Sequence, residues 1–206
     1  ECRVSMDGTA LQGRRTNNHI HTTYSFSPYS PTAAVYAARM EGLCTAGIID
    51  HDSISGAREF LAAAELVGMP VTVGMECRVS MDGTALQGRR TNNPDQVGVS
   101  YMTIQSVPHD KIEMLNAWFA PYRAARGRRN RAMVGKINAL LPGIALDYDR
   151  DVLPLSEAKE DGGVTERHLM YALAKKMTQK AGKGQPMIDY LASIGLSLSE
   201  KQKTQM

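Results

Sequence analysis

The sequence contains few cysteines: only Cys2, Cys44 and Cys77. Three scattered cysteines cannot build a disulfide framework or a cysteine-based zinc site. The chain also lacks any apolar run that approaches the length of a membrane span, and we expect no signal peptide at its start. Its formal net charge is only +3. These shortages predict a reduced, cytoplasmic protein with no membrane association.

The chain is long enough to fold around a core of its own. With 206 residues, of which 43% are hydrophobic, it can bury one substantial domain or slightly more. The sequence character changes after Leu141-Pro142-Gly143. We therefore divide the chain into a main portion over 19–142 and a mainly helical portion over 143–206.

An identical stretch of sequence occurs twice. Residues 1–18 and 76–93 share the letters ECRVSMDGTALQGRRTNN. Structural repeats diverge in sequence and need several stacked units, so one identical partial copy indicates an artefact of assembly or a very recent duplication. The second copy is expected to be the native one, because Glu76 completes an apolar run over 71–75. We therefore exclude residues 1–18 from the prediction of the fold.

The most informative short motif is His19-Ile20-His21. In an extended strand, side chains two residues apart lie on the same face, so both imidazoles can reach the same metal ion or two neighbouring ions. Imidazole suits zinc, iron and manganese-like metals. A His-x-His pair is also found as a surface accident or a hydrogen-bonded pair, so the motif needs support from elsewhere in the chain.

From His19 onward, the chain alternates between strand and helix signals. Ser30 is a favoured N-cap, with Pro31 at the first position of a helix predicted over 32–41. A second helix is predicted over 55–67, with Leu66 in its apolar stripe. The apolar runs over 44–49 and 71–75 suit buried parallel strands. This order predicts right-handed βαβ units and a parallel sheet.

Residues that can bind metals follow each predicted strand. His19 and His21 belong to the first strand, Asp50-His51-Asp52 follows the second, and Glu76 follows the third. Reactive groups of α/β folds gather at the carboxyl ends of the strands, so these side chains are expected to lie together.

Plainer interpretations exist for each of these residues. Asp50 can simply cap the turn that follows it, and Glu76 can be a solvated strand end. His51 is harder to explain in this way, because a histidine between two carboxylates after a buried strand is typical of a metal ligand. Together, the four residues favour a shared metal site over independent accidents.

Three motifs in fixed order resemble the opening of the polymerase and histidinol phosphatase (PHP) family. They are HIHTTYS, then GIIDHDSISGAREF, then VTVGMECR, within residues 19–76. The resemblance implies an α/β fold of the PHP type: a distorted, seven-stranded β/α barrel, incomplete in this chain, with a helical insertion or a C-terminal helical segment. It also implies hydrolysis of phosphoesters with two or three divalent metal ions, either zinc, manganese or iron.

The family pattern carries over residue by residue. It implies metal ligands at His19, His21, His51 and Glu76, and catalytic roles for His51 and Asp52. Two departures limit the resemblance. Phe26-Ser27 stand where many members have an acidic or histidine ligand, and the late Ala-His-Pro and Asp-x-His motifs are absent. The missing late motifs predict that the chain is an N-terminal part of a longer protein.

The second half of the chain carries two further signals. The segment over 97–107 predicts a strand, and Asp110 is a suitable N-cap for the helix that follows. Five arginines then follow: Arg123, Arg126, Arg128, Arg129 and Arg131. They could bind phosphate, or they could form the solvated face of a long helix. We favour the solvated face.

A helix is predicted to begin at Thr165. Its Thr-x-x-His-Leu start resembles a helical insertion over the active site of PHP phosphoesterases, where Arg167 and His168 would bind substrate phosphate at the helix N-terminus. The alternative is a partly buried polar pair on an amphipathic helix. Beyond residue 185, the sequence predicts one or two short helices.

The sequence therefore predicts a phosphoesterase that uses a metal-activated water. Its substrate would be a phosphorylated small molecule or an oligonucleotide, and nucleotides and sugar phosphates both remain candidates. One alternative is a non-catalytic PHP-like module with a degraded metal site that binds nucleotide or a partner protein. Another is a metal-dependent hydrolase of carbon–nitrogen bonds, which the order of Asp-His-Asp before Gly-x-Glu disfavours. The sequence assigns no oligomeric state.

Overall fold

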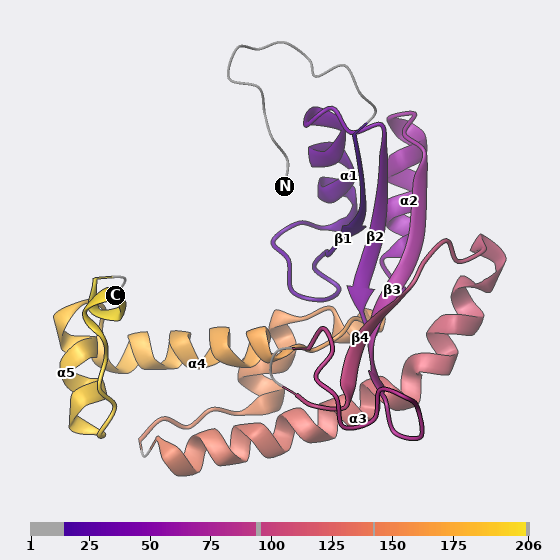
Figure 1. Cartoon of the computed structure of the whole chain (residues 1–206). Coiled ribbons are helices and arrows are strands. Elements are labelled where there is room, and N and C mark those ends of the chain that lie inside the picture. The colour runs from indigo at the N-terminus through magenta and orange to yellow at the C-terminus, as the bar shows by residue number, and fades with distance from the viewer. Residues whose placement is uncertain (1–14, 94–95, 142, 205–206) are drawn as a thin grey trace.

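The structure, a computed structural model, describes residues 15–93, 96–141 and 143–204. Its centre is a curled, mixed sheet in which the four strands lie in chain order (Figure 1). The strands are β1 (Thr16–Ile20), β2 (Thr45–His51), β3 (Val71–Ser80) and β4 (Val99–Ile104). The chain is thus of the α/β class, as expected, and its described residues form four strands, whereas the family resemblance implies seven.

The first half of the chain folds as two βαβ units. Helix α1 (Pro31–Met40) joins β1 to β2, and α2 (Ala57–Leu66) joins β2 to β3, with both strand pairs parallel. The Ser30 side chain accepts a hydrogen bond from the Ala33 amide, and Pro31 opens α1, as predicted. The helix start confirms the capping signal in the sequence, because an N-cap side chain satisfies one of the free amides there.

The parallel sheet predicted for the first three strands is confirmed, and the fourth strand, for which no orientation was predicted, is antiparallel. β3 is ten residues long and continues past Glu76, and β4 returns beside it in antiparallel register, with Glu76 opposite Thr103. The two strands lie close together, since a Cβ at Gly74 would overlap the Ile104 carbonyl oxygen. The apolar run over 71–75 therefore marks only the buried half of the strand.

The main core lies between the sheet and its helices. Val35 of α1, Phe60 of α2 and Met75 of β3 are almost fully buried, and they pack together with Ile112 and Phe119 from the next helix. The prediction for Leu66 is wrong: it is 88% exposed, because it is the last residue of α2 and points away from the sheet.

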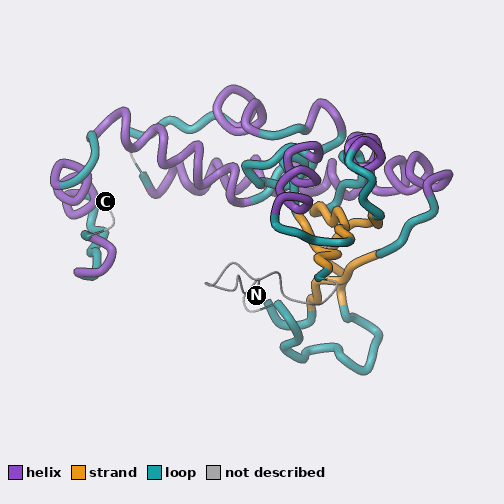
Figure 2. The backbone as a smooth tube through the Cα atoms, turned by 90° about the horizontal axis from the view of Figure 1, so that it is seen from above, coloured by secondary structure: helices purple, strands orange, loops and turns teal. Residues whose placement is uncertain are grey.

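A second core forms where later helices meet. Helix α3 (Ile112–Leu140) is 29 residues long, and Val134 near its end packs with Leu169 of α4 (Glu166–Ala181) and with Val152. Figure 2 shows the strands gathered at one end of the molecule, with the C-terminal helices reaching away from them. The remaining elements are η1 (His109–Lys111), η2 (Tyr148–Val152), η3 (Leu153–Leu155), η4 (Ala158–Glu160), α5 (Gln185–Ser193) and α6 (Glu200–Lys203).

The repeated stretch contributes to the sheet at its end. β1 begins at Thr16, so the last three residues of the first copy belong to this strand, and two of them, Thr16 and Asn17, pair with β2. The expected boundary at residue 19 therefore falls inside the strand. Residues 1–14 lie outside the described residues, and the interpretation of the copy as an artefact stays a prediction. Within the described ranges, no helix combines the length and the apolar character needed to cross a bilayer.

Candidate metal centre

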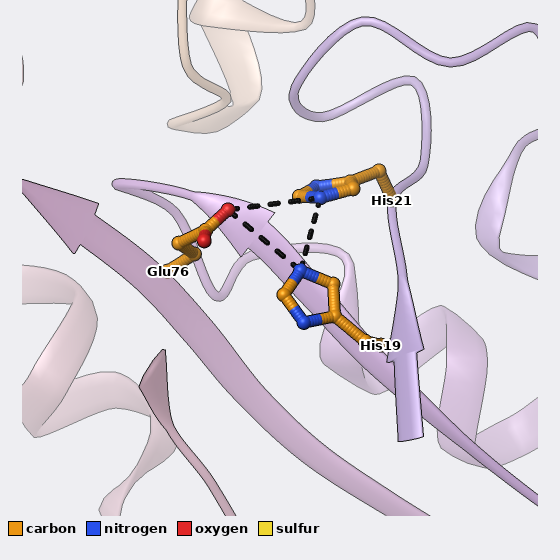
Figure 3. Close-up of side chains that lie close together, drawn as sticks. All are labelled: His19, His21 and Glu76. Carbon is orange, nitrogen blue, oxygen red and sulfur yellow. Dashed lines mark hydrogen bonds and ion pairs between the residues drawn. The ribbon is translucent and has the colours of Figure 1, made fainter. Parts of the chain in front are cut away.

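The two histidines of the His-x-His motif lie at the carboxyl end of β1, where they were predicted to converge. Their Nε2 atoms are 3.2 Å apart, and both imidazoles face the same point (Figure 3). The shared direction follows from the strand period of two, which places alternate side chains on one face. His19 is exposed, whereas His21 is partly buried.

Glu76 supplies a third donor from β3. Its Oε2 atom is 3.7 Å from Nε2 of His19 and 3.7 Å from Nε2 of His21. The three ligand atoms all lie within 4.8 Å of one another. Ligand atoms bound tetrahedrally at zinc distances are separated by about 3.4 Å. Two imidazoles and a carboxylate at these separations therefore fit a divalent metal ion in both geometry and donor chemistry.

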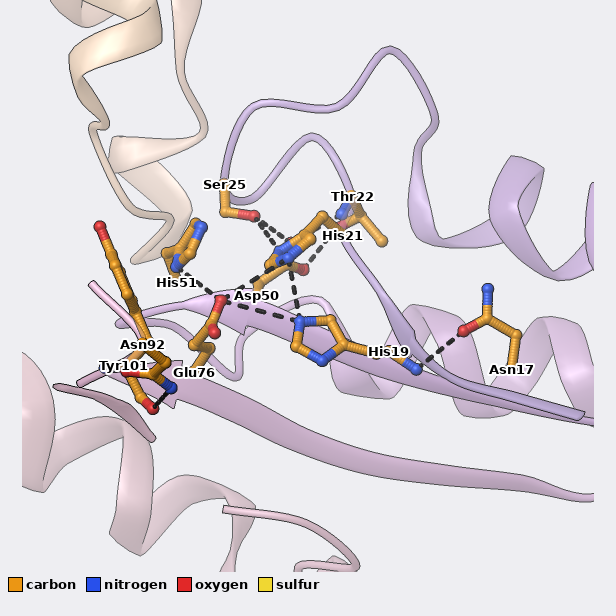
Figure 4. Close-up of polar contacts among 10 residues, drawn as sticks. All are labelled: Asn17, His19, His21, Thr22, Ser25, Asp50, His51, Glu76, Asn92 and Tyr101. Carbon is orange, nitrogen blue, oxygen red and sulfur yellow. Dashed lines mark hydrogen bonds and ion pairs between the residues drawn. The ribbon is translucent and has the colours of Figure 1, made fainter. Parts of the chain in front are cut away.

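His51, the last residue of β2, reaches the same carboxylate. Its Nδ1 atom is 3.2 Å from Glu76 Oε2, and its ring stacks on that of His21 with the centroids 4.6 Å apart. Figure 4 shows His51 approaching this oxygen from the side away from His19. Three of the four predicted ligands thus form one donor cluster, and the fourth contacts the cluster through Glu76.

Burial favours the neutral form of these histidines. It lowers the pKa of His21, and the neighbouring His19 lowers it further. The pKa of His51 falls to about 3, mainly because of burial and secondly because of His21. A neutral imidazole has a free ring-nitrogen lone pair, which is the form that binds a metal. At neutral pH, both side chains are therefore in the ligating state.

Asp50 connects the histidine loop to β2. This carboxylate is 1% exposed and accepts hydrogen bonds from the Thr22 amide, the Thr22 hydroxyl and the Ser25 hydroxyl (Figure 4). Burial raises the pKa of Asp50, and its hydrogen bonds from Ser25 and Thr22 oppose the rise. The alternative interpretation, in which Asp50 caps the following turn, does not hold, because its hydrogen-bond partners precede it by more than twenty residues.

Asp52 follows His51 in the chain and contacts the backbone of Glu76. Its backbone has a left-handed φ of 54°, its amide donates to the Glu76 carbonyl, and its carboxylate pairs with Arg126 at 2.5 Å. Burial raises the pKa of Asp52, and Arg126 opposes the rise. Asp52 thus ties β2, β3 and α3 together; the catalytic role that we predicted for it stays a prediction.

Two arginines of α3 point inward. The side chains of Arg123 and Arg126 are only 11% and 14% exposed, and Arg123 donates to the Asp52 carbonyl. The favoured interpretation of the arginine run as a solvated face is therefore wrong for these two residues, although Arg128 and Arg131 are exposed. The difference arises because the run follows the helix period and only one side of α3 faces the sheet.

A cavity of about 330 Å³ opens beside the histidines. It is lined by Arg78 of β3, Arg126 of α3 and Arg167 of α4, together with Tyr101 of β4. The α4 start is held close to the cluster, since the Gly163 amide donates to the Tyr24 carbonyl. A side chain at position 163 would clash, because a Cβ there would lie 2.5 Å from the His51 carbonyl oxygen.

His168 does not line this cavity, which corrects its predicted contact with substrate. The side chain is 1% exposed, and its Nδ1 atom accepts a hydrogen bond from the Thr165 amide at the start of α4. Its ring also packs edge-on against Phe26, with the centroids 4.7 Å apart. The residue faces inward because it is the third residue of the helix, where a side chain can reach back to the N-cap amide. Arg167, its exposed neighbour, does line the cavity.

The buried His168 predicts a loss of stability in acid. Burial lowers its pKa to about 4, against 6.5 in the unfolded chain, so the unfolded state binds the proton more tightly. Its contribution is present above pH 6.5 and is lost as the pH falls toward 4, by roughly 3 kcal/mol. His168→Gln should lose less stability than wild type between pH 7 and pH 4.5 in urea unfolding, because glutamine takes up no proton in this range. The helix start should be retained, because glutamine also caps at this position.

The exposed His109 provides the matched control for this experiment. His109→Gln should retain the acid dependence of the wild-type protein, because the side chain is on the surface. His21 and His51 also have lowered pKa values, so the measured quantity is the difference between variants rather than the total acid loss. Identical pH profiles for His168→Gln and wild type would contradict the prediction.

Three residues at this centre were not assigned to it from the sequence. Arg78 and Tyr101 lie on either side of the loop over 81–98, and Arg126 is far from the motifs in sequence. The inward position of Arg126 had one available signal, its place within a helix-period run of arginines. The positions of Arg78 and Tyr101 depend on the antiparallel pairing of β3 with β4, which local sequence patterns do not indicate.

Parts of this sequence are similar to known proteins. No protein-family model matches it. A 5'-3' exoribonuclease of Haemophilus influenzae is 28% identical over 150 residues, which cover 73% of this chain and 47% of the relative. Error-prone DNA polymerases of Mycobacterium bovis and Mycobacterium tuberculosis are 30% identical over 115 residues, 55% of this chain and 10% of the polymerases. The chain thus spans less than half the length of the curated relatives that it matches.

Solved structures share the fold. A protein from Bifidobacterium adolescentis, assigned as a metal-dependent phosphoesterase, superposes with a TM-score of 0.63 at 25% identity, covering 91% of this chain and 57% of that one. An amidohydrolase from Chromobacterium violaceum gives a TM-score of 0.59 at 21% identity, covering 82% of this chain and 51% of that one. The second likeness concerns the fold alone.

Proposed function

The resemblance of this chain to the PHP family is confirmed by its sequence and structural relatives, and from that premise we propose that it is a metal-dependent phosphoesterase. The observation that carries the proposal is the donor cluster of His19, His21 and Glu76 beside an arginine-lined cavity. Metal donors alone suit many reactions. Donors next to three converging guanidinium groups suit a substrate that carries phosphate, because arginine binds phosphate oxygens through paired hydrogen bonds.

The residues present fit the metal that the family uses. His19, His21 and Glu76 would hold the ion, and His51 would be a further metal ligand beside the Glu76 carboxylate. A divalent ion at this position supplies an activated water at neutral pH and polarises the phosphoryl oxygens. The protein contributes neutral imidazoles, which burial maintains, and a fixed carboxylate. We propose a divalent metal from the set zinc, manganese and iron.

The arginines that line the cavity would bind the substrate phosphate and not the metal ion. Arg78, Arg126 and Arg167 come from three different elements, so a bound phosphate would join β3, α3 and α4. Arg126 is already paired with Asp52, whereas Arg167 is exposed at the first turn of α4. The helix start adds a favourable partial positive charge for an anion. Arg167 is therefore the residue that we assign to substrate binding.

The cavities have room for a substrate as large as a nucleotide or a short nucleic-acid strand. The site beside the histidines measures about 330 Å³. Arg78 and Arg126 also line an adjoining groove of about 840 Å³, which contains Trp118 and Tyr122 of α3. Aromatic side chains next to arginines suit the bases and phosphates of a nucleic-acid strand. Nucleotides, oligonucleotides and sugar phosphates all remain within the proposed substrate class.

The proposed activity is tested by hydrolysis of an aryl phosphate, a mononucleotide and a short oligonucleotide. Activity should disappear after chelation and return with added zinc, manganese or iron. Arg167→Ala should raise KM about tenfold or more while lowering kcat less, because a residue that mainly holds substrate affects binding most. Arg39→Ala, an exposed arginine on α1 away from the cavity, is the matched control and should match wild type.

The alternative to an enzyme is a binding module without catalysis. Phe26, which stands where many family members have a ligand, is the feature that favours this alternative. Such a module would bind a nucleotide without turnover, and binding would survive chelation. Failure of the protein to hydrolyse any of these substrates with any of the three metals, combined with chelator-insensitive binding, would replace the phosphoesterase proposal with this one.

A further inference from the structure

The hydroxyl of Ser25 lies between a buried carboxylate and a metal-binding histidine. Its Oγ atom is 2.5 Å from Asp50 Oδ1 and 3.3 Å from His21 Nδ1. Ser25 is 3% exposed and Asp50 is 1% exposed, so bulk water does not compete for these contacts. The three groups form a continuous chain that ends at the ring whose other nitrogen faces Glu76 (Figure 4).

The direction of each hydrogen bond in this chain is fixed by the carboxylate. Asp50 accepts two further hydrogen bonds from the Thr22 amide and hydroxyl, so it acts as an acceptor on both oxygens. Ser25 must therefore donate its only hydroxyl proton to Asp50. The remaining lone pairs of Ser25 Oγ can only accept, and the partner within reach is a proton on His21 Nδ1.

The position of that proton determines which nitrogen of His21 is free. A neutral imidazole carries one proton, so a proton on Nδ1 leaves the lone pair on Nε2. Nε2 is the atom that lies 3.2 Å from His19 Nε2 and 3.7 Å from Glu76 Oε2. The opposite tautomer would direct an N–H bond into the donor cluster and would block binding of a cation.

We infer that Ser25, held by Asp50, is a positioning residue that fixes His21 in the tautomer with Nε2 free for the metal. The inference rests on the proposed metal site and adds the group that orients one of its ligands. Hydrogen bonds of this kind set the tautomer and ring orientation of metal-binding histidines, and their removal typically weakens metal affinity 10–100-fold.

Thr22 provides an internal comparison. It shares Asp50 with Ser25 but has no contact with a histidine ring among the described interactions. The Thr22 contacts therefore anchor the loop to β2, whereas Ser25 alone links Asp50 to a ligand. Loss of the Ser25 hydroxyl leaves Asp50 with two of its three donors, so Ser25→Ala should keep the loop in place.

The experiment compares wild type, Ser25→Ala and Ser27→Ala. Ser27 is on the same loop and its hydroxyl accepts only from the Tyr29 amide among the described contacts, which makes it the matched control. Proton–nitrogen NMR of ¹⁵N-histidine-labelled, metal-free protein reports the tautomer of His21 directly. Calorimetric titration with Zn²⁺ reports the metal affinity, and thermal melting checks that each variant is folded.

We expect a proton on His21 Nδ1 in wild type and in Ser27→Ala, and a mixture of tautomers in Ser25→Ala. Zn²⁺ affinity should fall about tenfold or more in Ser25→Ala only. An unchanged tautomer and unchanged affinity in folded Ser25→Ala would overturn the inference but leave the proposed function standing. Absence of Zn²⁺ binding in wild type would instead overturn the metal site, and the NMR result would still decide whether Ser25 sets the tautomer.

Discussion

Glu76→Gln is expected to abolish both metal binding and phosphoester hydrolysis while leaving the fold intact. Oε2 of Glu76 lies within 3.7 Å of ring nitrogens of His19, His21 and His51. An amide of nearly the same volume keeps the packing but removes the negative charge that offsets a divalent cation. Elemental analysis after dialysis, activity measurements and thermal melting together test this expectation.

Glu65→Gln is the matched control for this substitution. Glu65 is an exposed residue near the end of α2, far from the cluster, and its loss should change neither metal content nor activity. Hydrolysis at wild-type rates by Glu76→Gln would exclude the predicted site. Retained metal with lost activity would limit the role of Glu76 to catalysis and leave binding to the histidines.

The sequence predicted those parts of the site that depend on local signals. The Ser30 cap, the buried run before Asp50 and the strand period of two at His19 and His21 each act within a few residues. Parallel βαβ units then bring the ends of successive strands to one edge without further information. The convergence of the two histidines with His51 and Glu76 therefore follows from local patterns and chain order.

Contacts between distant segments could not be read in the same way. Asp50 serves a loop that precedes it, and Asp52 pairs with an arginine 74 residues later in the chain. Hydrophobic periodicity indicates which side of an element is buried but does not identify its polar partner. The antiparallel β4 is a similar case, because a long loop separates it from β3 and the Asp82-Gly83 turn signal in that loop is not followed directly by the returning strand.

His168 shows how a correct local prediction can lead to a wrong functional one. The helix start at Thr165 was predicted correctly. The same cap occupies His168, because the His168 ring accepts a hydrogen bond from the Thr165 amide and does not face the cavity. A residue at this position either reaches back to the cap or faces outward. Its nearly complete burial decides between these possibilities, and burial by the Phe26 loop depends on tertiary structure.

Breaking the Asp52–Arg126 pair is expected to cost more stability than any other single ion-pair change proposed for this chain. The two side chains are 9% and 14% exposed, so loss of one partner leaves a charge that water reaches poorly. Removal of one member of a buried pair typically costs about 3–5 kcal/mol. Asp52→Asn should show a loss of this size in urea unfolding, since asparagine tolerates the left-handed backbone at this position.

Arg58→Met provides the control, because Arg58 and Glu113 form an ion pair that is 61% and 68% exposed. Loss of an exposed pair should cost about 1 kcal/mol or less. The double variant Asp52→Asn/Arg126→Met should recover part of the loss, since it buries no unpaired charge. Equal costs for the exposed and the buried pair would show that solvent reaches Asp52 and Arg126 freely.

The loss in Arg126→Met should depend on pH in a defined direction. Burial already raises the pKa of Asp52 above 3.8, and Arg126 is the largest influence that lowers it. Without Arg126 the folded-state pKa rises further, so the folded chain binds the proton more tightly than the unfolded chain does. Stability is then favoured below the unfolded pKa and lost as the pH rises through the folded one. The deficit of Arg126→Met relative to wild type should be largest at neutral pH and should shrink toward pH 4, whereas a deficit independent of pH would indicate lost packing of the arginine stem instead of an unpaired carboxylate.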